Sequence, residues 1–174
     1  MKNWYMLSLV GRDRPSIVAE LSAGLCKSGC NLGDSSMARL GDNFTIMLMA
    51  EHEGSLETME SLVRPIAEKL GLNHHLVAIE GGVHHDIEPD VRISLYTQDR
   101  RGVVGDVTGP LAGAGLNILH LDSNVSEDED SPTYYIHIEG TVAGGIQPIY
   151  KVLEALQNEK KIHSHLIPIN PEIT

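Results

Sequence analysis

Apolar and polar positions along the first half of this chain follow two different periods in turn. Apolar residues are dense over residues 4–10 and then recur at helical spacing at Ile17, Val18, Leu21 and Leu25. This change of period predicts a strand, a turn and an amphipathic helix. Extended runs over residues 31–40 and 44–50, a helical period over residues 56–70 and a strand over residues 75–80 complete the set.

The second half of the chain repeats this pattern. Residues 93–118 align without a gap on residues 7–32 at an offset of 86, so that Leu95 falls on Leu9. Further strands are predicted over residues 91–96, 117–125, 133–139 and 162–169, with helices over residues 101–114 and 146–158. Because the period is too long for a solenoid unit, we expect two copies of one domain. They would cover residues 1–80 and 91–174, with a linker over residues 81–90.

Each copy has the order βαββαβ. This order predicts an α+β fold, the ferredoxin-like arrangement, in which two helices cover one face of an antiparallel four-stranded sheet. We place Pro15 at the first position of the first helix and Gly29 at its C-terminal cap. The sheet would have two open edges, which proteins pair or cover, so we expect a homo-oligomer.

Composition narrows the function. The formal charge of −11 and the lack of a basic stripe argue against direct binding of nucleic acid, and an aromatic content of 4% argues against a stacking platform for bases. No apolar stretch is long enough for a membrane span and no secretory signal is visible, which favours a cytoplasmic protein. Cys26 and Cys30, the only cysteines, are expected to be small buried apolar residues in a reducing compartment.

The turn between the first strand and the first helix of each copy is the best candidate for a binding site. Free backbone N–H groups at a helix N-terminus, with the positive end of the helix dipole, suit a carboxylate. These groups would belong to Ser16, Ile17 and Val18 in the first copy and to Gly102, Val103 and Val104 in the second. The neighbouring turn residues Arg14, Pro15 and Arg100 join this candidate site.

Two further residue types recur beside these turns. Asn31 and Asn117 each begin the next strand, and an amide can bind either end of a zwitterion. Asp13 and Asp99 could accept a hydrogen bond from an ammonium group. The alternative is that these Asp and Asn residues only cap turns and touch no ligand, and the residue types alone leave that alternative open.

The first copy resembles an ACT domain. The resemblance is carried by the run Gly11 to Pro15, by Ile17 and Val18, and above all by SGCNLGDSSMARLGDNFTIML, which is similar to the first of two ACT domains in the family of the glycine cleavage system transcriptional repressor. The second copy is a looser match, with Arg101 in place of the proline, Pro110 inside its helix and a longer hairpin. The first copy is therefore the stronger candidate for ligand binding.

The resemblance implies a regulatory protein that binds a small amino acid such as glycine where two ACT domains lie edge to edge. It also implies action through a partner protein such as a transcription factor, with no cofactor. A regulatory subunit of an amino-acid biosynthetic enzyme is the alternative. The first copy is also similar to the ACT domain that precedes formyltetrahydrofolate hydrolase, but here a second ACT domain follows it and no catalytic domain does.

Catalysis and metal binding find little support in the sequence. No nucleophile stands beside a base in a known motif, so we expect no enzyme activity. Two histidine pairs suggest a metal, but neither pair has the neighbours that complete a metal site. These are His84 with His85, beside Asp86, and His163 with His165. The acidic run from Glu127 to Asp130 lacks the glycine of a calcium loop and is expected to be a solvated hairpin.

Overall fold

The computed structural model describes residues 2–80, 87–126 and 132–170. The chain divides into two compact units, Met1–His85 and Asp86–Thr174. Part of the expected linker, including His84, His85 and Asp86, and the acidic run from Glu127 to Asp130 lie outside the described residues.

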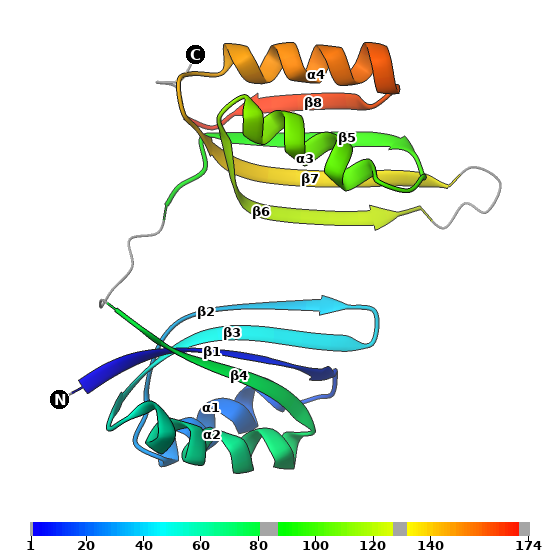
Figure 1. Ribbon diagram of the computed structural model, residues 1–174. Coiled ribbons are helices and arrows are strands. Elements are labelled where there is room, and N and C mark those ends of the chain that lie inside the picture. The colour runs from blue at the N-terminus through cyan, green and yellow to red at the C-terminus, as the bar shows by residue number, and fades with distance from the viewer. Residues whose placement is uncertain (1, 81–86, 127–131, 171–174) are drawn as a thin grey trace. The chain divides into compact units, whose positions relative to one another are not determined.

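The first unit contains four strands and two helices in the expected order. They are β1 (Lys2–Arg12), α1 (Ile17–Lys27), β2 (Asn31–Leu40), β3 (Asn43–Glu53), α2 (Leu56–Leu70) and β4 (Leu72–Ile79). The strands are all antiparallel and lie in the order β2-β3-β1-β4. Both helices cover the same face of this sheet (Figure 1). The predicted ferredoxin-like arrangement is confirmed.

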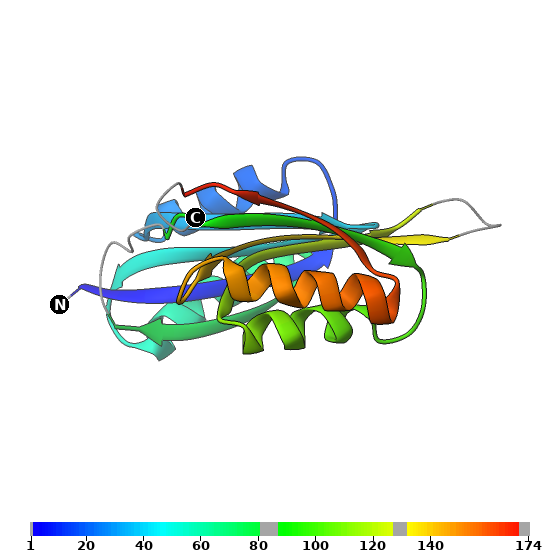
Figure 2. The same ribbon diagram turned by 90° about the horizontal axis from the view of Figure 1, so that it is seen from above.

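The second unit has the same topology. Its elements are β5 (Val91–Gln98), α3 (Val103–Gly113), β6 (Leu116–Val125), β7 (Thr133–Val142), α4 (Gln147–Lys160) and β8 (His163–Pro168), with strand order β6-β7-β5-β8. Seen from above, α3 and α4 run side by side along its sheet (Figure 2). The repeat in the sequence is therefore a repeat of structure.

Each unit has its own hydrophobic core between sheet and helices. Alternate residues of β1, Tyr5, Leu7 and Leu9, point into the first core, where they meet Leu21 and Leu25 of α1. Ile93 and Leu95 of β5 take the corresponding places in the second core. The two core clusters share no residue. The period of two in the strands and of three to four in the helices thus decides which residues are buried.

Two local expectations were wrong. Pro15 lies in the turn and not in the helix, because Ser16 adopts a left-handed conformation (φ 69°) that delays the start of α1 until Ile17. In the second unit Gly102 (φ 85°) likewise delays α3 until Val103. Cys30 is buried beside Met59, but Cys26 is exposed because it follows the buried Leu25 and so turns toward solvent.

Candidate functional site

The turn between β1 and α1 is held by contacts to the β2–β3 hairpin and to the first turn of the helix. The N–H of Asp13 donates to the carbonyl of Asp42 at 2.8 Å, and its carboxylate pairs with Arg39 at 3.0 Å. Arg14 pairs with Glu20 at 2.9 Å, and this hydrogen bond lowers the pKa of the Glu20 carboxyl. Both Asp13 and Arg14 therefore have structural partners.

The second turn uses the same device. The N–H of Asp99 donates to the carbonyl of Pro132 at 2.8 Å, and Arg100 pairs with Asp106 at 2.7 Å. The Asp106 carboxyl accepts hydrogen bonds from Lys160 and Arg100, and both bonds lower its pKa, the one from Lys160 most strongly. The recurrence of Asp and Arg in the two copies thus has a structural reason that needs no ligand. This favours the turn-capping interpretation of Asp13 and Asp99, and it gives Arg14 and Arg100 structural partners as well.

The helix N-termini remain available as backbone donors. Because each helix begins two residues later than expected, the free groups are the N–H of Ile17, Val18 and Ala19, and no acceptor for them is found within the described residues. In the second copy the corresponding groups include the N–H of Val103 and of Val104, at the start of α3. The side chains of Ile17 and Val103 are buried in their cores, so only their backbones could contact a ligand.

The left-handed turn residue gives a direct test of local strain. A non-glycine residue in this conformation costs about 1–2 kcal/mol, and Gly102 occupies the position that Ser16 has in the first copy. Ser16→Gly is expected to raise the free energy of unfolding of the first unit by about 0.5–1 kcal/mol, the strain being offset in part by the greater freedom of unfolded glycine. Chemical denaturation measures this, and Gly102→Ser should lower the stability of the second unit. A loss of stability in Ser16→Gly would show that the serine side chain supports the turn.

Asn31 lies at the other end of the domain from this turn. Asn31 pairs with Glu51, which pairs with Trp4 near the start of β1, whereas Asp13 follows Arg12 at the end of β1. The eight residue-to-residue steps from Trp4 to Arg12 span roughly 26 Å. Figure 1 shows the start of β2 and the arrowhead of β1 at opposite ends of the sheet. Asn117 is separated from Asp99 in the same way. One domain therefore does not bring the predicted site residues together.

A hollow of about 260 Å³ surrounds Asn31. Its lining also includes Gly29, Lys2 of β1, and Glu51, His52 and Glu53 of β3. Lys2 and Glu51 form an ion pair of 2.8 Å, which raises the pKa of the lysine. The Nδ1 atom of His52 is buried and has no hydrogen-bond partner among the described residues. Carboxylates, an ammonium group and an amide can together hold both charges of a zwitterion.

Sequence inspection missed Lys2, Glu51, His52 and Glu53. The signal that could have found them is the fold itself, because in a βαββαβ unit the end of the third strand lies beside the start of the second. The second copy differs here. Thr141, Val142 and Ala143 stand where the first has Glu51, His52 and Glu53, and the Ala143 N–H donates to the Gly115 carbonyl at 3.0 Å. The carboxylates are thus a property of the first copy.

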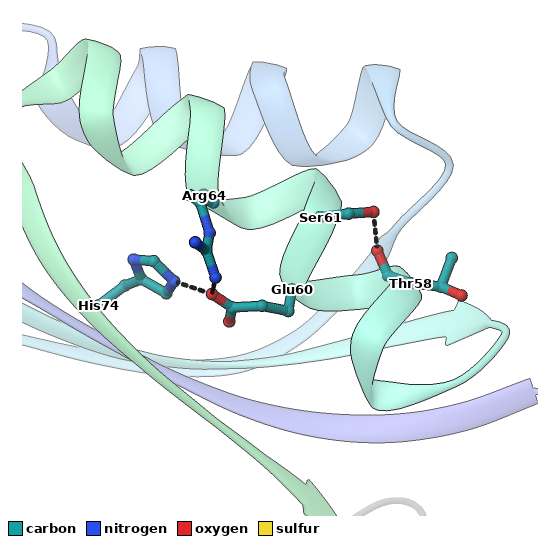
Figure 3. Close-up of polar contacts among 5 residues, drawn as sticks. All are labelled: Thr58, Glu60, Ser61, Arg64 and His74. Atoms are coloured by element: carbon teal, nitrogen blue, oxygen red, sulfur yellow. Dashed lines mark hydrogen bonds and ion pairs between the residues drawn. The ribbon is translucent and has the colours of Figure 1, made fainter.

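The copies also differ between their second helix and last strand. In the first, Nε2–H of His74 and the guanidinium of Arg64 both donate to Glu60 at 2.9 Å, and the bond from His74 bridges β4 to α2 (Figure 3). Both bonds lower the pKa of the Glu60 carboxyl, and the bond from His74 has the larger effect. In the second, Tyr150, Glu154 and Ser164 replace that trio, and a groove of about 390 Å³ lies between α4 and β8.

The described residues give no support for a metal site or a membrane-spanning helix. No group of three or more His, Cys, Asp or Glu side chains there is placed to hold a metal ion. None of the helices described has the length and apolar character needed to cross a lipid bilayer.

Known proteins share both the sequence pattern and the architecture. Family profiles for the ACT domain match residues 5–76 and 91–159. Glycine cleavage system transcriptional repressors of Escherichia coli (strain K12) and Shigella flexneri are each 24% identical over 160 residues, which is 87% of this chain and 84% of theirs.

Solved structures show the same fold. An unknown protein from Galdieria sulphuraria superposes with a TM-score of 0.79 at 20% identity, over 97% of this chain and 99% of its own. A structure described as a glycine cleavage system transcriptional repressor superposes with a TM-score of 0.76 at 19% identity, over 98% of this chain and 99% of its own. At these identities the likeness establishes the fold of the chain and leaves its ligand open.

Proposed function

The chain belongs to the ACT-domain proteins, with two such domains in tandem, and from this we propose that it is an amino-acid-sensing regulatory protein. The ligand is a small amino acid, with glycine the first candidate because the curated relatives are named as repressors of the glycine cleavage system. The protein acts as a transcriptional regulator without catalytic activity of its own.

The observation that carries this proposal is the division of the candidate site. Asn31 with its hollow lies at one end of the domain and the free N–H groups of Ile17 and Val18 lie at the other. A ligand that uses both must therefore sit between two ACT domains, one presenting its β1–α1 turn and the other the start of its β2. The N–H groups would take the carboxylate, and Asn31 with Glu51 would take the ammonium group.

Edge strands give a physical reason for domains to associate. β2 is exposed along almost its whole length and pairs with β3 on one side only. Such an edge offers free N–H and C=O groups to another strand. We propose a homo-oligomer in which ligand binding changes how the domains pack, because a ligand shifts an assembly only through its different affinity for two states.

The negative charge of the chain supports action through a partner protein. With a net charge of −11, the chain repels the phosphate backbone, so regulation of transcription requires a second protein that contacts DNA. Co-purification from native extract, with and without amino acids, separates this from regulation of a biosynthetic enzyme. Recovery of an enzyme in place of a transcription factor would overturn the transcriptional role and leave the sensing role intact.

Calorimetric titration with the twenty amino acids tests sensing directly. We expect one or a few small amino acids to give measurable heat and a rise in the melting temperature, because a ligand that binds only the folded state stabilises it. Absence of both effects at millimolar concentration would contradict the proposal.

Asn31→Ala tests the placement of the ligand. We expect this change to weaken amino-acid binding by about 1–3 kcal/mol, the cost of leaving a buried polar group of the ligand unpaired. Asn117→Ala is the matched control and should have the smaller effect, because the second copy lacks the acidic residues of the first hollow. Unchanged affinity in a folded Asn31→Ala protein would remove Asn31 from the site.

A further inference from the structure

The open face of the first sheet, on the side away from α1 and α2, is apolar at its centre. Tyr5, Leu7 and Leu9 of β1 point into the core, so the residues that alternate with them point to the open face. The adjacent strands β3, β1 and β4 expose there a group of large apolar residues that we call the apolar patch: Trp4, Met6 and Val10 of β1, Met47 of β3, and Val77 and Ile79 of β4. Figure 1 shows that both helices of this unit cover the opposite face.

Strand register makes the apolar patch continuous. Met6 lies between Met49 of β3 and Val77 of β4, so a whole row across the three strands is apolar on this face. Met47 and Val77 keep 52% and 43% of their surface exposed. The open face of an antiparallel sheet is usually polar because it meets water, and a continuous exposed apolar patch marks an interaction site.

The second unit carries polar residues at the corresponding positions. Arg92 and Glu139 stand where the first unit has Met6 and Met49, and their side chains form an ion pair of 2.7 Å. The strands of this second sheet therefore alternate apolar and polar residues, as a sheet with one solvated face does. The fold itself does not require an apolar open face, so the methionines on the first sheet need a reason of their own.

Charge does not oppose the approach of a second copy at this face. The chain as a whole carries −11, but the two cations and two carboxylates of β1, β3 and β4 sum to zero. All four lie at strand ends, around the apolar patch: Lys2, Arg12, Glu51 and Glu53. An apolar centre with a polar rim is the usual anatomy of a protein–protein interface.

We propose that the apolar patch packs against the same patch of a second copy of this chain, sheet face on sheet face. The first sheet has four strands of 8 to 11 residues. At the usual rise and spacing its face measures roughly 33 Å by 19 Å. Two such faces bury about 1,200 Å², the lower bound for a stable specific interface. A twofold axis makes this contact self-complementary, because each apolar centre then meets the other.

The face-to-face contact is separate from the association proposed above. The ligand-linked association uses the β2 edge of the sheet, whereas this contact uses the open face of β1, β3 and β4. Either can therefore fail without the other.

Sedimentation equilibrium of the full chain tests the face-to-face contact. We expect Met47→Glu to halve the mass of the assembly, because the contact would bury an unpaired carboxylate. Met47 is exposed in the single chain, so the variant should fold, and circular dichroism checks this. His137→Glu is the matched control and should leave the mass unchanged, because His137 holds the place of Met47 in the second sheet.

Trp4 gives a second readout that is specific to this face. It is the only tryptophan of the chain, and its ring reaches across the sheet to Gly33, where an added Cβ would come within 2.9 Å of it. A second sheet packed on this ring excludes water from it. We therefore expect the emission of the wild-type chain to move to longer wavelength on dilution, and that of Met47→Glu to stay at long wavelength throughout.

Three results would overturn the proposal. A wild-type chain that stays monomeric at its highest soluble concentration would remove the contact altogether. Unchanged mass in a folded Met47→Glu protein would place association elsewhere, such as at the β2 edge. Emission from Trp4 that does not depend on protein concentration would show that no second copy covers this face.

Discussion

Replacing Leu9 by alanine is expected to lower the free energy of unfolding of the first unit by about 3–4 kcal/mol. Leu9 is 1% exposed and lies within the first core cluster. Truncating a buried leucine removes its transfer free energy and leaves a cavity, for which losses of about 2.7–5 kcal/mol are typical. The second core cluster contains none of the same residues, so its stability should not change.

Leu95→Ala provides the matched control, because Leu95 holds the same place in the second unit and is also 1% exposed. Urea denaturation can separate the units, since the only tryptophan, Trp4, lies in β1 and its fluorescence follows the first unit alone. Circular dichroism follows both. An equal loss of stability by both probes in Leu9→Ala would show that the units unfold as one.

Gly140→Ala is expected to destabilise the second unit by roughly 2–4 kcal/mol. Gly140 pairs with Val91 on one side and with Ile118 on the other, where β6 has a bulge. An added Cβ would collide with the carbonyl oxygen of Asn117 and come within 3.1 Å of Leu116. The backbone of β6 would have to move, and the pairing at this end of the sheet would weaken.

The first copy supplies the comparison, because alanine is already present there. Ala50 pairs with Tyr5 and Leu32 at the position equivalent to Gly140 and is fully buried. Ala50→Gly should therefore cost only about 1 kcal/mol, from lost packing and greater freedom of the unfolded chain. Thermal denaturation measures both changes. An unchanged melting temperature in Gly140→Ala would mean that the bulge yields at no cost.

Much of the fold could be predicted from the sequence because each strand and helix shows its own spacing of apolar residues along a short stretch of chain. Leu9 and Leu95 align within strands whose alternate residues are buried, and Leu21 and Leu25 lie on the buried stripe of α1. The start of that helix could not be predicted, because Ser16 gives no sign that it adopts the left-handed conformation usual for glycine. Cys26 is exposed because it is next to Leu25 in the helix, and one residue further along a helix turns the side chain from the core toward solvent.

The candidate site was harder to predict because it depends on contacts between distant strands. Asp13 and Asn31 are close in the sequence, but the helix between them carries the chain back to the other end of the sheet. Glu51 and His52 join Asn31 only through the pairing of β2 with β3. The side-by-side placement of Tyr96, Tyr135 and His163 likewise needs the register of β5, β7 and β8, which no run of neighbouring residues reveals.

Asn31 and the β1–α1 turn are separated by the length of a strand, and this separation bears on whether the affinity for the ligand depends on protein concentration. A binding site completed by a second domain of the same chain gives an affinity that does not depend on how much protein is present. A site completed by another chain gives an affinity that rises with protein concentration, because association and ligand binding are then linked. Amino-acid titrations at several protein concentrations would distinguish the two, and in the second case the cell's own level of this protein would set the amino-acid level to which it responds.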